Sequence, residues 1–179
     1  MFIITVTDSG VLDAFNRLMA FGESPQPALL AIGEKMLVFT KERFDLSEDP
    51  YGTPWEPNSD TTLRSMLHGN GKNFKKKGGL SKRGATLLAG KKPLIGESRS
   101  LSAQFNSTVI GDNLVTLSSP MVYAAMQQYG GTKAQFPNLW GDIPARPFFP
   151  DLGRGLPDAL QQDISSVLRI AIQNAMRST

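Results

Sequence analysis

The chain has 179 residues, of which 40% are hydrophobic and 20% charged, a composition typical of a globular protein rather than a disordered one. It contains no cysteine, which excludes disulfides, thiolate metal sites and cysteine nucleophiles and fits a protein made and used in the cytoplasm. No apolar run approaches the roughly 18 residues that a membrane-spanning helix requires, so we expect no membrane contact.

The net charge of +3 is unevenly distributed. Between Thr61 and Gly96 there are nine basic residues and no acidic one, which leaves ten basic against 16 acidic residues in the rest of the chain. The sequence therefore predicts an acidic body that carries one basic segment. Parts of opposite sign attract each other across a subunit boundary.

The N-terminal segment predicts a strand followed by a helix. Residues 2–6 alternate weakly and are β-branched, and the start of the chain lacks the basic region of a signal peptide. Asp8 or Ser9 is expected to cap a helix. Its apolar stripe consists of Val11, Leu12, Phe15, Leu18 and Met19.

The stretch "GESPQP" interrupts this helix, and a second helix is expected with Pro27 in its first turn, running to about Asp45. Its apolar face comprises Leu29, Ile32, Met36, Leu37, Thr40 and Phe44.

The stretch "FDLSEDPYGTPWEPNSDTT" then places a tryptophan between two prolines. Pro54 and Pro57 each lack a backbone donor, so Trp55 belongs to neither a helix nor a central strand. An aromatic side chain in such a loop either fills the core or is presented to a partner. The residues alone leave both interpretations open.

Residues 69–90 are rich in glycine and lysine and poor in apolar side chains, which predicts a flexible basic loop or arm. Two β-prone runs, Ala103–Ile110 and Asn113–Ser118, follow and are joined by "GDN", which predicts a hairpin. A short helix is expected after Ser119-Pro120, ending at Gly130-Gly131.

A second proline-rich stretch leads into a C-terminal helix, expected from about Leu156 to Arg177. Its apolar stripe comprises Leu156, Leu160, Ile164, Val167, Leu168, Ala171 and Ala175. The predicted class is α+β, as a single domain over residues 1–179, with N-terminal and C-terminal helices packed on a small antiparallel sheet.

Catalytic chemistry finds little support in the residues. His68 is the only histidine, and no "GxSxG" elbow accompanies a serine. The acidic residues between Glu42 and Asp60 do not match a calcium loop, and "GNGKNFKKKGG" lacks the spacing of a phosphate-binding loop. We therefore expect no enzyme and no cofactor.

The basic segment offers two functions. Its basic side chains could track phosphates, with Phe74 stacking on a base, or the segment could dock on acidic protein surface. The candidate partner-binding residues are Lys72, Lys75, Lys76, Lys77, Lys82 and Arg83.

Four motifs in order resemble the phage virion morphogenesis family, the tail completion proteins of Mu-like and related long-tailed bacteriophages. They are "EDPYGTPWEPN", "KPLIGESRSLSAQF", "YAAMQQYGG" and "IPARPFFP", and the likeness extends from about Leu29 to the C-terminus. Residues 1–27, the predicted N-terminal strand and helix, are expected to be an addition or a divergent part. The motif residues are Asp49, Pro50, Gly52, Trp55, Pro57, Tyr123, Ala124, Gln127, Gly130, Pro144, Arg146, Pro147 and Phe148.

The resemblance implies a structural virion protein that completes the tail or joins it to the head without catalysis. Gln127 stands where members often have histidine, which argues further against catalysis. The implied partners are copies of the chain in a ring, with a hexamer expected, and tail tube, connector or neck proteins. The implied location is the head–tail junction or tail end of the virion, and the host cytoplasm during assembly.

The resemblance also implies that the tryptophan loop and "IPARPFF" pack together, with Arg146 bracing a carboxylate or backbone carbonyls. The alternative function is a nucleic-acid-binding module that contacts DNA through Lys72–Arg83.

Overall fold

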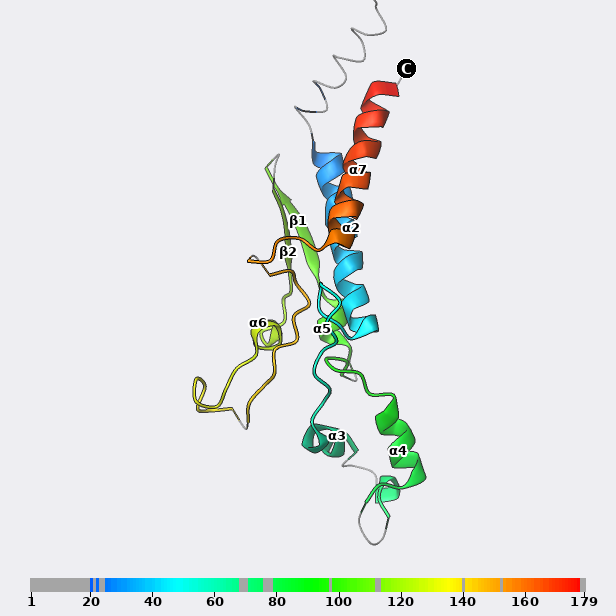
Figure 1. Ribbon diagram of the computed structural model, residues 1–179, viewed down its shortest axis with the longest axis vertical. Helices are drawn as coiled ribbons and strands as arrows, with labels where there is room; N and C mark the ends of the chain where they lie inside the picture. The colour runs from blue at the N-terminus through cyan, green and yellow to red at the C-terminus, as the bar shows by residue number, and fades with distance from the viewer. Residues whose placement is uncertain are drawn as a thin grey trace, which may run out of the picture. The chain divides into compact units, whose positions relative to one another are not determined.

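The computed structural model describes residues 20, 22, 25–67, 71–75, 79–96, 98–111, 114–139, 141–151 and 153–177 (Figure 1). The chain divides into two compact units. The first is drawn from Met1–Thr40, Phe105–Pro120 and Asp151–Thr179, and the second from Lys41–Gln104 and Met121–Pro150. The expectation of a single domain stays a prediction.

The predicted α+β class is confirmed, since the described residues form several helices and a two-stranded antiparallel sheet. None of the described helices has the length and apolar character needed to cross a membrane. The predicted strand of residues 2–6 and the helix after Asp8 lie outside the described residues.

Helix α2 (Gln26–Leu46) has Pro27 in its first turn and ends within one residue of its predicted end. Its residues up to Thr40 belong to the first unit. The predicted apolar face is largely buried: Ile32, Thr40 and Phe44 are fully buried, and Leu29, Met36 and Leu37 are half-buried. Periodicity alone therefore located this helix and its inward face.

The predicted hairpin is confirmed. Strands β1 (Asn106–Ile110) and β2 (Leu114–Ser118) pair antiparallel, with Val109 opposite Val115. The first strand begins later than predicted, because Ser100–Ala103 form the short helix α5. A Cβ on Gly33 of α2 would lie 2.7 Å from Ser107 Oγ and 3.4 Å from Val115 Cγ1. Helix α2 thus approaches both strands closely.

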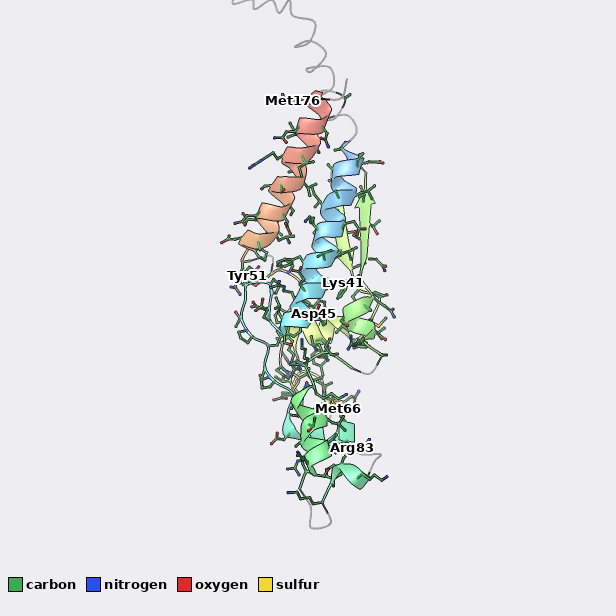
Figure 2. The ribbon with its side chains drawn as sticks, turned by 90° about the vertical axis from the view of Figure 1, so that its right-hand side faces the viewer. Lys41, Asp45, Tyr51, Met66, Arg83 and Met176 are labelled. Atoms are coloured by element: carbon green, nitrogen blue, oxygen red, sulfur yellow. The ribbon has the colours of Figure 1, made fainter. Side chains whose placement is uncertain are left out.

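Helix α7 (Asp158–Arg177) lies beside α2 in both views (Figures 1 and 2). It is anchored at its start by Leu160, which is 1% exposed. After Leu160 the predicted stripe is half-buried except for Leu168, which is exposed, and Leu156 lies exposed just before the helix. An ion pair between the two helices, Lys35 Nζ to Asp163 Oδ1 at 3.7 Å, joins half-exposed groups and adds little stability.

The second unit contains α3 (Asp60–Leu67), the 3₁₀ turn η1 (Gly71–Asn73), α4 (Lys82–Ala89), α5 and α6 (Ala124–Tyr129). Helix α3 has no counterpart in the prediction. It starts where Ser59 Oγ accepts from the Thr62 backbone N–H at 3.2 Å, an N-terminal capping contact. Helix α6 begins four residues after Pro120, later than predicted.

The prediction of a loop throughout residues 69–90 is wrong for Lys82–Ala89, which form α4. Ser81 caps this helix: its Oγ accepts from the Gly84 N–H at 3.1 Å and donates to the Lys72 carbonyl at 2.8 Å. The low apolar content pointed to a loop, but a serine cap followed by helix-forming residues starts a helix at little cost.

We predict that Gly33→Leu destabilises the first unit. The added side chain meets Ser107 and Val115, and overpacking of this kind costs about 1–3 kcal/mol, more than the roughly 0.5–1 kcal/mol that removing a helix glycine gains. Urea unfolding measures the loss. Glu34→Leu, one residue along on the exposed side of α2, is the control and should change stability by about 0.5 kcal/mol or less. Equal stabilities would contradict the close approach.

Candidate functional site

The tryptophan loop, Asp49–Pro57, is shaped by one carboxylate. Asp49 is buried, and its Oδ1 accepts from the backbone N–H groups of Tyr51 and Thr53, both at 2.8 Å. The Asp49 N–H donates to the Thr53 carbonyl at 2.7 Å, and Gly52 takes a φ of +86°. A short acidic side chain that bonds its own downstream backbone is what this tight turn requires.

Trp55 is 6% exposed, so it belongs to the core and is not presented to a partner. Its ring meets Phe44 edge-on at a centroid distance of 5.3 Å, and Phe44 lies 5.4 Å from Phe148. The indole Nε1–H donates to the Pro147 carbonyl at 2.8 Å. The loop and the IPARPFF segment, Ile143–Phe149, therefore pack together as expected.

Arg146 braces backbone carbonyls, one of the two roles expected for it. Its Nε–H donates to the Glu56 carbonyl at 2.7 Å and an Nη2–H to the Pro57 carbonyl at 3.0 Å. Burial lowers the pKa of the Arg146 guanidinium, and the nearby Glu56 carboxylate partly opposes that shift. A guanidinium stays charged in proteins, so a buried cation holds the loop.

Gln128 of α6 holds the other side of the IPARPFF segment. Its Oε1 accepts from the N–H groups of Phe148 at 2.9 Å and Phe149 at 3.0 Å, and its Nε2 donates to the Phe149 carbonyl at 3.0 Å. Sequence reasoning singled out Gln127 and missed Gln128. The available signal was the spacing of Ala124 and Gln128, four residues apart on one helical face, which are both buried.

Gly130 lets the end of α6 approach the segment. It has a φ of +68°, and a Cβ there would lie 2.7 Å from both the Ala145 nitrogen and the Ile143 carbonyl oxygen. Gly131 and Ile143 exchange backbone hydrogen bonds of 2.9 and 2.8 Å. The motif glycine thus serves a close backbone approach.

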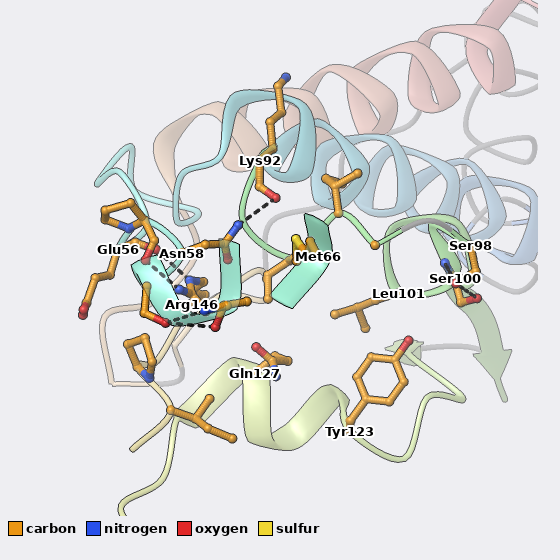
Figure 3. A pocket seen from close by; sticks show the side chains of 18 of the residues that line it. Glu56, Asn58, Met66, Lys92, Ser98, Ser100, Leu101, Tyr123, Gln127 and Arg146 are labelled. Atoms are coloured by element: carbon orange, nitrogen blue, oxygen red, sulfur yellow. Dashed lines mark hydrogen bonds between the residues drawn. The ribbon is translucent and has the colours of Figure 1, made fainter. Parts of the chain in front are cut away.

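The second unit also holds a cleft of about 400 Å³ (Figure 3). Tyr123, just before α6, and Gln127 of α6 project towards the wall that carries Met66 of α3 and Leu101 of α5 (Figure 3). The motif residues Pro144 and Arg146 close one end. The motifs therefore meet around one concave, mixed-polarity surface.

Several polar groups of the cleft are tied to the backbone. Asn58 Nδ2 donates to the Lys92 carbonyl at 3.4 Å, and Asp142 Oδ1 accepts from the Lys133 N–H at 2.7 Å. The Lys92 ammonium group points away from the cleft (Figure 3) and donates to the Asp45 carbonyl at 2.5 Å. Within the described ranges there is no group of three or more His, Asp or Glu residues that could hold a metal ion. Hydrogen bonds of this kind hold the surface of the cleft in one conformation.

The basic segment presents its charges outward. Lys72, Lys75, Lys82 and Arg83 are exposed, on the stretch from η1 to α4. Lys75, Lys82 and Arg83 make no ion pair with any residue that the structure describes. Lys76, Lys77 and His68 lie outside the described residues. The described part of the segment is thus a positively charged, solvent-facing surface.

A model of the phage virion morphogenesis family matches residues 6–173. The match begins well before Leu29, so most of residues 1–27 lies within the matched region. That these residues are a divergent part of the chain stays a prediction. No curated protein and no solved structure matches this chain.

We predict that Gln128→Ala destabilises the second unit by about 2–4 kcal/mol, because the buried N–H of Phe148 and the half-buried N–H and carbonyl of Phe149 lose their partner. Urea unfolding followed by tryptophan fluorescence measures the effect. Gln127→Ala is the matched control, since Gln127 is half-buried on the cleft side of the same helix, and should cost about 0.5 kcal/mol. Equal losses of stability in the two variants would show that the three hydrogen bonds of Gln128 add nothing to the stability of the second unit.

Proposed function

The chain belongs to the phage virion morphogenesis family, and on that premise we propose that it completes the tail or joins it to the head as a subunit of a ring at the tail–neck junction. The observation that carries the proposal is the family match over residues 6–173. Family membership gives the chain a part in virion assembly, and the narrower role is our inference.

A role without catalysis accords with the site. The motif residues hold two irregular segments together: Asp49 shapes a turn, Trp55 and Arg146 bind carbonyls across the loop, and Phe148 is fully buried. Side chains committed to backbone partners are not poised as nucleophile or base. The motifs therefore serve the architecture of the second unit.

The charge distribution supplies a means of assembly. A subunit of a closed ring needs two different faces that complement each other, because each copy contacts the next head to tail. The exposed basic side chains of the second unit and the acidic excess of the remaining sequence provide opposite signs. We propose that the basic segment meets acidic surface on the neighbouring copy, with a hexamer as the expected ring.

The mass of the purified chain in solution, measured by light scattering at low and moderate salt, tests this proposal. We predict a discrete ring-sized species that loosens as salt rises, because exposed ion pairs are screened. Lys82→Glu with Arg83→Glu should abolish the ring. Lys41→Glu with Lys133→Glu, the same charge change at exposed positions outside the segment, should leave it intact.

If both double variants behave alike, the basic segment is not the contact. If the natural chain is a monomer at every salt concentration, the ring does not close without a template. The measurement is then repeated with purified tail tubes added to the chain. Failure of tail tubes to recruit the chain would contradict the proposed role itself.

DNA binding is the second candidate, favoured by the four exposed cations around η1 and α4 beside half-buried Phe74. It predicts affinity for DNA that falls steeply with salt, since each phosphate contact releases counterions. Fluorescence anisotropy of a labelled duplex measures it. The Lys82→Glu, Arg83→Glu variant should lose this affinity while the Lys41→Glu, Lys133→Glu variant keeps it. Weak binding at low salt by the natural chain would exclude this function.

A further inference from the structure

The cleft of about 400 Å³ in the second unit holds a buried cation. Arg146 is 7% exposed and lines one end of the cleft. No acidic side chain among the residues that the structure describes forms an ion pair with it. A buried charge without a counterion is costly, so this guanidinium favours an anionic partner.

The guanidinium of Arg146 is only partly committed to its own chain. An arginine side chain has five N–H donors, and Arg146 uses its Nε–H for the Glu56 carbonyl and one Nη2–H for the Pro57 carbonyl. Its Nη1 has no hydrogen-bond partner in the described part of the chain. This atom is not enclosed in the interior, since Asn73 Oδ1 is the one fully buried side-chain atom without a partner among the described residues. The free N–H groups therefore face the cleft that Arg146 lines.

The other charged side chains of the cleft are exposed to solvent, which screens them. Glu56, Lys92 and Asp142 are all exposed. Lys92 Nζ and Asp142 Oδ1 also bind backbone groups, the Asp45 carbonyl and the Lys133 N–H. Arg146 is thus the charge that a ligand in the cleft meets with the least screening by water.

The walls around Arg146 suit a segment of polypeptide. Met66 and Tyr123 line the cleft although they are 43% and 44% exposed, so they offer apolar surface to a ligand (Figure 3). The Tyr123 hydroxyl and the Gln127 amide can pair with backbone groups of a bound chain. Arginine, tyrosine and methionine are side chains enriched at protein interfaces. A protein segment is therefore the class of ligand that these walls fit.

We propose that this cleft binds an extended segment of a partner protein in which an acidic side chain is flanked by apolar ones. The carboxylate accepts hydrogen bonds from the N–H groups of Arg146 that its own chain leaves free, and the apolar side chains contact Met66 and Tyr123. Arg146 keeps its two bonds to the tryptophan loop while it holds the ligand. This inference does not rest on ring assembly.

Calorimetric titration of the full chain with two blocked tripeptides tests the proposal. Acetyl-Leu-Glu-Leu-amide carries the carboxylate, and acetyl-Leu-Gln-Leu-amide has nearly the same shape without the charge. We expect the acidic peptide to bind at least about tenfold more tightly, because a hydrogen bond between two charged groups is stronger than one to a neutral amide. Equal affinities, or no binding of either peptide at millimolar concentrations, would overturn the proposal.

Two variants at Met66 locate the binding in the cleft. Replacement of Arg146 would also release the tryptophan loop, whereas Met66 is exposed and leaves that contact in place. Met66→Glu puts a carboxylate into the cleft and should weaken binding of the acidic peptide about tenfold, because like charges repel and the new carboxylate competes for Arg146. Met66→Gln, of similar size and uncharged, should keep the affinity within about twofold. Equal affinities of the two variants would contradict binding in this cleft.

A further control separates the cleft from the exposed basic segment. Lys82 and Arg83 do not line the cleft, so the Lys82→Glu, Arg83→Glu variant should bind the acidic peptide within about twofold of the natural chain. Loss of peptide binding in this variant would assign the peptide to the basic segment and overturn the proposal.

Discussion

The second unit depends on one constraint, which is that its proline-rich backbone needs hydrogen-bond partners that no sheet supplies. Buried backbone groups without partners are costly, and proline removes donors without removing carbonyls. Side chains provide these partners. The Trp55 indole binds the Pro147 carbonyl, the Arg146 guanidinium binds two carbonyls of the opposite loop, and Gln128 binds three groups of Phe148 and Phe149. Each contact links residues about 20 or 90 positions apart in the chain, so the two irregular segments are stable only together.

This arrangement separates what the motifs do from what the surface does. A side chain that saturates backbone groups in the interior cannot also present its polar atoms to a partner. The motif residues that are buried, such as Asp49 and Trp55, thereby define the shape of the second unit, while exposed residues such as Lys82 and Arg83 remain on its surface.

Regular elements could be predicted because their information is local. The spacing of apolar residues located α2 and α7, and "GDN" between two β-prone runs located the hairpin. Helix α4 was missed because its stability comes from the Ser81 cap rather than from buried apolar area. Gln128 was missed because nothing near it in the sequence indicates that its partners lie about 20 residues further on. The resemblance to a family brought the tryptophan loop and IPARPFF together, but not the atoms that join them.

The first unit differs from the second, because its structure is limited by exposed apolar surface on α7 rather than by backbone groups that need hydrogen-bond partners. Helix α7 is fully buried at Leu160, but Leu168, Ile170 and Met176 are exposed, so its later turns bury less apolar area and contribute less to stability than its first. Attraction between exposed charged side chains is of another kind, because it is weak singly, sensitive to salt and strongest when several pairs act together. A ring held by contacts of this kind therefore needs several of them at each boundary and loosens as salt rises.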